Sequence, residues 1–180
     1  MSFASLTASR KNASVPFFLL LAFLQTQQRD LKFERDPAAA PAPAAAIPRS
    51  YALVVGVSKY LKLPAAAHLR YPERDAEAIY SILISPEGGN FRAENVRKLV
   101  GSKATLAELR KALEEWLPSV TTANDRVVIY FAGHGFLHQG RAYLAPHDFD
   151  PADIAGTGYR MDTLGTVFGG RIKGKWKVLL

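Results

Sequence analysis

Cysteine is absent from all 180 residues of the chain. This absence excludes disulfide bonds, thiolate metal sites and any thiol nucleophile supplied by these residues. Two other signatures of enzyme chemistry are also missing. Ser58 does not lie in a Gly-x-Ser-x-Gly elbow, which argues against a serine hydrolase. The pairs Gly88-Gly89 and Gly169-Gly170 lack the lysine and the spacing of a phosphate-binding P-loop.

Acidic side chains are outnumbered by basic ones, 16 against 23, so the formal net charge is +7. Such a charge favours acidic partners or anionic surfaces but does not define a fold. The basic run at 171–177 contains one aromatic residue, Trp176. Binding of nucleic acid needs aromatic platforms or a basic groove. We therefore interpret this run as solvated charge leading into a strand, and predict no nucleic-acid partner.

The first 49 residues are predicted to be a leader and a linker. Basic residues at 10–11 precede an apolar run at 15–24, the pattern of a secretory signal or a membrane tether. The run is shorter than the roughly 20 apolar residues that span a bilayer, and no clear cleavage site follows it. Residues 1–28 are thus predicted to be a signal-like or membrane-tethering leader of an exported or membrane-associated protein. An incidental apolar leader on a cytoplasmic protein is the alternative. Residues 29–49 are charged and then rich in proline and alanine, which predicts an extended linker.

From residue 50 onward, strands and helices are expected to alternate. The continuous apolar run at 51–57 is typical of a strand covered on both faces. A helix is predicted to begin at Pro72 and to stop at Ser85. A short edge strand is expected at 95–100. The buried stripe of the helix is expected to comprise Ala76, Ile79, Ile82 and Leu83.

The second half of the domain repeats this alternation. Thr105, followed by Glu108 three residues later, is expected to cap a second helix that Pro118 ends. A strand at 126–132 follows. The order predicts an α/β three-layer sandwich with a mostly parallel central sheet. Weaker patterns predict a hairpin-like segment at 141–146, a short helix at 161–168 and a last strand from 176.

One histidine stands where a buried strand ends. The strand at 126–132 is followed by Gly133-His134-Gly135, and glycine on both sides lets the backbone turn sharply and approach a ligand closely. Ligands of α/β sheets bind beyond the carboxyl ends of strands. Because an imidazole transfers protons near neutral pH, His134 is the leading candidate for an acid–base residue. The alternative is a turn histidine satisfied by backbone carbonyls.

His138 follows His134 by four residues, a spacing found in zinc sites. That spacing aligns two imidazoles only on a helix, and Gly135 after a strand argues against one. No metal ion and no other cofactor is predicted.

Several segments together resemble the caspase-like peptidase family, which comprises caspases, metacaspases and bacterial orthocaspases. The resemblance covers residues 50–180 and implies a caspase-like fold and a cysteine-type endopeptidase that hydrolyses protein or peptide substrates. Its motifs are YALVVGVSKY at 51–60, ERDA at 73–76, YFAGHG at 130–135 and GRAYLAPHD at 140–148.

The resemblance implies a Cys–His dyad. His134 matches the family histidine, and the backbone N–H of Gly135 is the expected oxyanion donor. The cysteine of caspases lies about 50 residues after the histidine, whereas 46 residues follow His134 here. We therefore expect the chain to be a fragment, or a natural truncation, with a C-terminally incomplete sheet. We also expect it to be proteolytically inactive by itself. A catalytically inactive caspase-fold module that binds or regulates partners is the second hypothesis.

The resemblance also suggests a substrate-binding residue. Asp75 matches the acidic residue with which metacaspase-like members hold a basic P1 side chain, which predicts cleavage after Arg or Lys. The alternative is that Asp75 only stabilises the helix dipole. Arg70 lies near the position at which caspases hold aspartate, but out of register.

Some metacaspases require calcium, so the acidic loop that contains Asp148, Asp150 and Asp153 is an alternative calcium site. An exposed polar loop is the simpler interpretation. His68 and His147 are interpreted as loop histidines. The sequence makes no prediction about the oligomeric state.

Overall fold

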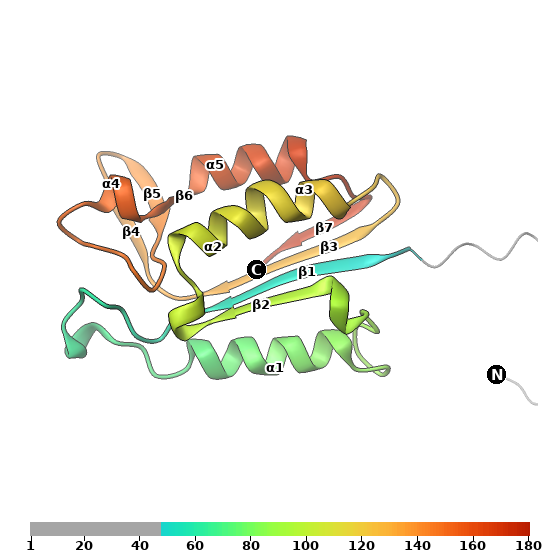
Figure 1. The fold of residues 1–180 in the computed structure, drawn as a ribbon, viewed down its shortest axis with the longest axis horizontal. Helices are drawn as coiled ribbons and strands as arrows, with labels where there is room; N and C mark the ends of the chain where they lie inside the picture. The colour runs from blue at the N-terminus through green and yellow to red at the C-terminus, as the bar shows by residue number, and fades with distance from the viewer. Residues whose placement is uncertain (1–47) are drawn as a thin grey trace, which may run out of the picture. The chain divides into compact units, whose positions relative to one another are not determined.

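The computed structural model describes residues 48–180, so the predicted leader and nearly all of the predicted linker lie outside the described residues. Four parallel strands form the central sheet in the order β2-β1-β3-β7 (Figure 1). All seven residues of β1 are buried, as its continuous apolar sequence predicts. The strands are β1 (Ser50–Gly56), β2 (Val96–Val100), β3 (Arg126–Ala132) and β7 (Trp176–Leu179).

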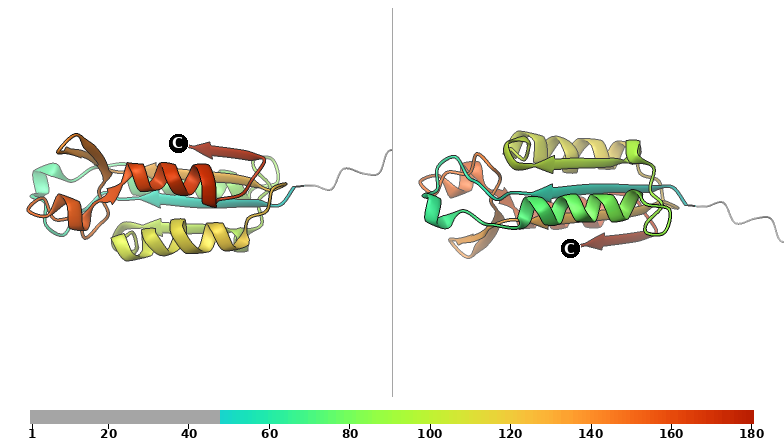
Figure 2. Two further views of the ribbon diagram at one scale, coloured as in Figure 1. Left: turned by 90° about the horizontal axis from the view of Figure 1, so that it is seen from above. Right: turned by 90° about the horizontal axis from the view of Figure 1, so that it is seen from below.

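Helices cover both faces of this sheet, which confirms the predicted three-layer α/β architecture (Figures 1 and 2). On β1, Ala52 and Val54 face α1, whereas Leu53 and Val55 face the opposite helical layer. The α1 helix (Pro72–Ile84) covers one face. The other is covered by α2 (Leu106–Arg110), the π-helical segment η4 (Lys111–Trp116), α3 (Leu117–Val120), α5 (Met161–Thr166) and the π-helical segment η5 (Val167–Arg171).

The parallel register brings the carboxyl ends of the strands to one edge. Gly56 of β1 pairs with Val100 of β2 and with Ala132 of β3. On the other side of β3, Ile129 pairs with Leu179 of β7, so β7 runs toward the same edge. Residues that follow β1, β3 and β7 therefore meet there.

A second, antiparallel sheet adjoins this edge. Its strands are β4 (Gly135–His138), β5 (Arg141–Leu144) and β6 (Tyr159–Arg160), in that order. Gln139 and Gly140 form the two-residue turn between β4 and β5, and both have positive φ, as the favoured hairpin turns require. The sequence predicted a hairpin-like segment only around β5 and missed β4 and β6.

The remaining elements are short. They are the 3₁₀ turns η1 (Ala65–Ala67), η2 (Ala93–Asn95) and η3 (Gly101–Lys103), and the helix α4 (Ile154–Thr157). Among residues 48–180, no helix has both the length and the apolar character needed to cross a bilayer.

Two local predictions were wrong. Pro118 does not end the second helical segment, which continues to Val120. The proline lies in the first turn of α3, where a missing N–H is tolerated. Ile82 does not belong to the buried stripe of α1, because 57% of it is exposed. Ile79 and Leu83 of the same helix do pack against the sheet.

Candidate active site

His134 lies just beyond the carboxyl end of β3, at the edge where β1 and β7 also point. Gly133, before it, is closely packed, because a Cβ there would come within 3.1 Å of the Phe131 ring and of the Tyr60 hydroxyl. Gly135, after it, is exposed, and a Cβ there would meet only a carbonyl oxygen at 3.6 Å. The backbone around the histidine is therefore tightly packed at Gly133 and open at Gly135.

The half-buried imidazole of His134 is fixed by a backbone carbonyl. Its Nε2 lies 2.7 Å from the carbonyl oxygen of Ala67. A carbonyl oxygen can only accept a hydrogen bond, so Nε2 must carry the proton. In the neutral ring Nδ1 is then the acceptor, and it makes no hydrogen bond to residues 48–180.

Tyr60 holds the same histidine through its backbone and its ring. Its hydroxyl accepts a hydrogen bond from the backbone N–H of His134 at 2.8 Å and donates one to the Val57 carbonyl at 3.1 Å. The two rings lie beside each other, with centroids 5.2 Å apart. Burial raises the pKa of Tyr60, so its hydroxyl stays protonated and can donate at neutral pH. Phe136 closes the other side, with its ring centroid 5.9 Å from that of the imidazole.

The backbone N–H of Gly135 is turned away from the neighbouring strand. The N–H of Ala145 donates to the His134 carbonyl at 2.9 Å, so His134 and Ala145 occupy a hydrogen-bonded position of the ladder, with one of its two bonds made. Hydrogen-bonded and non-hydrogen-bonded pairs alternate in an antiparallel ladder. The next pair, Gly135 and Leu144, is therefore of the second kind. Since β4 is an edge strand, the Gly135 N–H remains available to a ligand.

The loop between β1 and α1, which supplies the Ala67 carbonyl, is held by two further histidines. His147 Nδ1 lies 2.7 Å from the Lys59 carbonyl, and His68 Nε2 lies 3.3 Å from the Tyr60 carbonyl. Both are loop histidines, as predicted, and both bond to the backbone.

The acidic loop after β5 also has structural partners. Asp148 accepts a hydrogen bond from the Leu106 N–H at the start of α2, and Asp153 caps α4. Asp150 pairs with Lys62 at 2.9 Å. In the part of the chain that the structure describes, no three His, Cys, Asp or Glu residues are grouped for a metal ion.

Asp75 lies in the first turn of α1, and its side chain is exposed. The start of this helix packs on the carboxyl end of β1, because a Cβ on Gly56 would come within 2.7 Å of Ala76 Cβ. Burial, and then the charge of Asp75, raise the pKa of Tyr130 on β3. The carboxylate of Asp75 thus lies near Tyr130 at the start of the helix.

Sequence reasoning missed the role of Glu73. Its carboxylate accepts a hydrogen bond from the Ser58 N–H at 3.2 Å, and the Ser58 hydroxyl accepts one from the Glu73 N–H at 3.3 Å. Gly101, at φ +58°, lies against the same carboxylate. Glu73 therefore joins the ends of β1 and β2. Only its place in the first turn marks it in the sequence.

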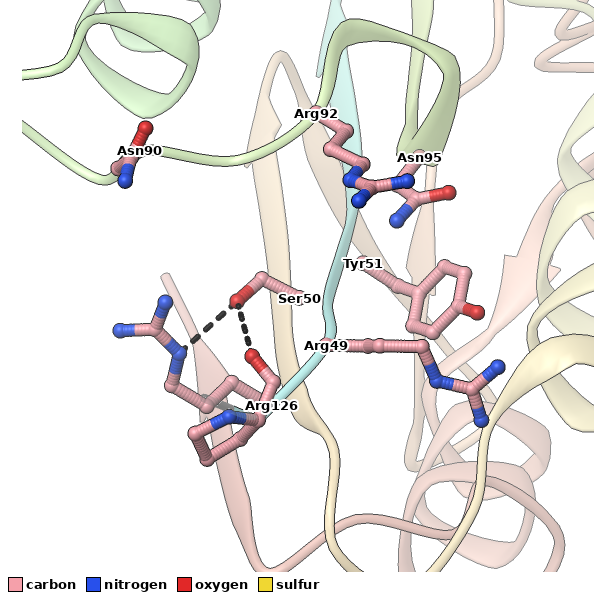
Figure 3. A pocket seen from close by; sticks show the side chains of 8 residues that line it. Arg49, Ser50, Tyr51, Asn90, Arg92, Asn95 and Arg126 are labelled. Carbon is pink, nitrogen blue, oxygen red and sulfur yellow. Dashed lines mark hydrogen bonds between the residues drawn. The ribbon is translucent and has the colours of Figure 1, made fainter. Parts of the chain in front are cut away.

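A cavity of about 540 Å³ lies at the amino ends of β1 and β3, the edge of the sheet opposite to that of His134. Figure 3 shows side chains that line it. The cavity borders the first residues of β1 and β3, where Arg126 Nε donates to the Ser50 hydroxyl at 2.9 Å. Arg92 and Asn95 line its other side. This cavity includes none of the predicted site residues.

A search of curated proteins finds no match. A comparison with solved structures agrees with the architecture described above. Among solved structures, the chain is similar to protein GSU0716 from Geobacter sulfurreducens, with 18% identity and a TM-score of 0.53. The similarity covers 73% of this chain and 49% of that one, so the chain spans about half the length of that protein. At this identity the likeness concerns the fold alone.

The family is shown by a domain match instead. Residues 49–169, well over half of the chain, match the caspase domain of the C14 peptidases. The matched range contains the Gly133-His134-Gly135 segment and all elements from β1 to α5. The chain therefore belongs to the caspase domain family of peptidases.

Proposed function

We propose that this domain is the histidine-bearing part of a caspase-like cysteine endopeptidase, in which His134 is the general acid–base residue. The observation that carries the proposal is the fixed tautomer of His134. Its Nε2–H is bound to the Ala67 carbonyl, and Nδ1 is left as an acceptor at the edge of the sheet. That is the arrangement that a base needs in order to take a proton from a thiol.

The proposed reaction follows from these groups. Nδ1 takes the thiol proton, and the thiolate attacks the carbonyl carbon of the scissile amide. The tetrahedral oxyanion accepts a hydrogen bond from the Gly135 N–H. The imidazolium then returns the proton to the leaving amine, which gives an acyl-enzyme that water hydrolyses. The Ala67 carbonyl accepts from Nε2–H throughout and stabilises the imidazolium.

The thiol must come from polypeptide outside these 180 residues, which contain no cysteine. We place it after β7. Leu180 follows the last residue of β7, and its carbonyl accepts a hydrogen bond from the Phe131 N–H of β3 at 3.0 Å. The segment after β7 therefore remains paired with β3 up to Leu180. His134 is three residues further along its own chain. A chain that continued in this register would carry its next few residues alongside the imidazole.

For substrate specificity we propose that Asp75 binds a basic P1 side chain. The support is its exposed carboxylate at the start of α1, on the edge at which β1 and β3 end. The expected substrates are therefore peptides with Arg or Lys before the scissile bond.

A cysteine added after Leu180 tests the proposed dyad directly. Extensions of three and of four residues that end in cysteine would sample both faces of a continued β7, because successive side chains of a strand alternate. In one of the two, we expect the thiol pKa, measured from the pH dependence of alkylation by iodoacetamide, to fall below the ordinary value of about 8.5. The decrease should disappear in the His134→Ala variant and persist in the His138→Ala variant.

Thiols with an ordinary pKa in both extensions, or a decrease that does not depend on His134, would contradict the proposed geometry. The 180-residue chain itself is expected not to hydrolyse arginyl peptide amides. Turnover by the purified chain would show that the reaction does not require a thiol. An inactive binding module, the second hypothesis, predicts ordinary thiols in both extensions.

A further inference from the structure

A second cavity lies on the α2 side of the sheet, between η4, β6 and α5. Its volume is about 340 Å³, and polar side chains line it: Arg110, Glu114, Tyr159, Arg160 and Thr163. A neighbouring cavity of about 280 Å³ shares Arg160 and Thr163 and extends to Arg171. The proposed reaction uses none of these residues.

Two buried polar atoms at this cavity have no hydrogen-bond partner. The Tyr159 hydroxyl and the Arg160 Nε are the buried side-chain atoms left unpaired within residues 48–180. Tyr159 is only 2% exposed, and both residues line the same cavity. An unpaired buried polar group is costly, and nearly all such groups in native proteins have a partner. Two adjacent ones at one cavity mark a place where a polar group, either water or a ligand, can bind.

The helices around the cavity are also unusual. The π-helical segment η4 carries Glu114, and the π-helical segment η5 carries Arg171. The Arg171 guanidinium donates to the Glu114 carbonyl and so ties the two segments together. Such π-helical turns are rare and frequently occur at functional sites. Their position here is a second observation, independent of the unpaired atoms, that sets this region apart.

The available groups define the chemistry of a ligand. Arg110, the Arg160 Nε–H and the Tyr159 hydroxyl are donors. Burial, followed by the charge of Glu114 and the close approach of its carboxylate to the phenol, raises the pKa of Tyr159, so the phenol remains protonated. The Tyr159 hydroxyl therefore lies beside Glu114 without making a hydrogen bond of ordinary geometry to it. The Glu114 carboxylate is the acceptor among these groups. The terminal nitrogen of Arg160 already pairs with Asp162 at 3.0 Å, so Arg160 offers its Nε–H, and Arg110 offers its whole guanidinium group. These donors suit an oxyanion, and the Glu114 carboxylate suits a hydroxyl or ammonium group beside it.

We propose that this cavity binds a small ligand that carries a carboxylate or phosphate next to a hydroxyl or amino group. The oxyanion would lie against Arg110, Arg160 and the Tyr159 hydroxyl, and the second group would donate to Glu114. The volume is within the range of small-molecule sites.

Titration of the 180-residue chain with three probes tests the site, by calorimetry and by thermal unfolding. Inorganic phosphate, glycerol 3-phosphate and L-serine distinguish a phosphate from a carboxylate ligand. At least one probe should bind and raise the unfolding midpoint. Tyr159→Phe should weaken its binding about tenfold, and Arg110→Gln by at least as much, because each removes a donor to a charged group. Tyr80→Phe on α1 and Arg92→Gln at the 540 Å³ cavity are matched controls, expected within about twofold of the unmodified chain.

The unfolding midpoint without ligand gives a second readout. Tyr159→Phe should leave it unchanged or raise it, because the variant removes a buried hydroxyl that makes no hydrogen bond of ordinary geometry within residues 48–180. The proposal fails if none of the three probes binds. It also fails if Arg92→Gln abolishes binding while Arg110→Gln does not, because the other cavity is then the site. A lower midpoint for Tyr159→Phe with unchanged probe binding would show that the hydroxyl has a structural partner, and would likewise overturn the proposal.

Discussion

The two edges of the central sheet are stabilised by different chemistry. At the amino edge, a buried carboxylate is satisfied by a neighbouring hydroxyl, a backbone N–H and an arginine. The buried Asp125 accepts hydrogen bonds from the N–H and the hydroxyl of Thr122 and lies 3.4 Å from Arg49. At the carboxyl edge, His134 and Tyr60 bond to the backbone instead, and the imidazole keeps one nitrogen without a partner among residues 48–180. At the amino edge these polar groups satisfy one another, whereas at the carboxyl edge one nitrogen of the His134 ring is left for chemistry.

The largest expected effect is the loss of activity on removal of the imidazole. In a polypeptide that carries the cysteine after β7, His134→Ala should lower kcat/KM for an arginyl peptide amide by about a hundredfold to ten-thousandfold. Arg92→Gln, at the amino edge, should leave kcat/KM unchanged. Equal losses in both variants would remove the functional difference between the two edges.

The reverse experiment removes a polar group at the amino edge. Asp125→Ala should lower the free energy of unfolding by about 2–3 kcal/mol, because it leaves the Thr122 donors without their acceptor. Urea denaturation measures this change. Glu94→Ala, which removes an exposed carboxylate in η2, just before β2, should cost less than about 0.5 kcal/mol. If Asp125→Ala is as mild as Glu94→Ala, the amino edge is not held by these bonds.

The Tyr60→Phe variant tests the carboxyl edge, because the Tyr60 hydroxyl stabilises the fold and also lies close to the proposed base, His134. Without the hydroxyl, the His134 N–H loses its acceptor and the Val57 carbonyl loses its donor. The free energy of unfolding should fall by about 1–2 kcal/mol. In the chains extended with cysteine, the thiol pKa should move back toward its ordinary value. Tyr80→Phe, on α1 and in none of the contacts of His134, should change neither quantity.

The smallest effect concerns Lys62 and Asp150, which connect the β1–α1 loop to the loop after β5. The Lys62 ammonium lowers the pKa of Asp150 below its ordinary value of 3.8. Because the folded-state pKa is the lower one, the pair stabilises the fold above that value, and the contribution is lost as the pH falls through the folded-state pKa. Lys62→Gln should therefore reduce the unfolding midpoint slightly at pH 7 and not at pH 2. High salt should weaken the difference at pH 7, because the pair is exposed. A difference that is the same at both pH values would assign it to something other than the ion pair.

Local sequence signals predicted the regular elements well. The strand expected at 126–132 is β3, residue for residue, and the helix expected from Pro72 is α1. Thr105 accepts the predicted capping bond from the Glu108 N–H at 3.3 Å. In each case the pattern is formed by residues close together in the chain, so the sequence alone is enough to predict it.

The contacts that orient the candidate site could not be predicted in this way. The partner of the His134 ring is the main chain of Ala67, 67 residues earlier, and alanine has no side chain that marks such a role. The Glu73–Ser58 pair spans 15 residues and depends on how α1 docks on β1. The short strand β6 is recognised only by its pairing with β5, at Tyr143 with Arg160 and Leu144 with Tyr159.

The anchor of the imidazole has a consequence for how this protein can change over time. Ala67 contributes an oxygen that every amino acid possesses, so the identity of the residue at that position is free to drift without loss of the anchor. What must be preserved is the path of the main chain from Val57 to Tyr71. An insertion or deletion in that stretch would therefore do more harm to the histidine than any single replacement at position 67.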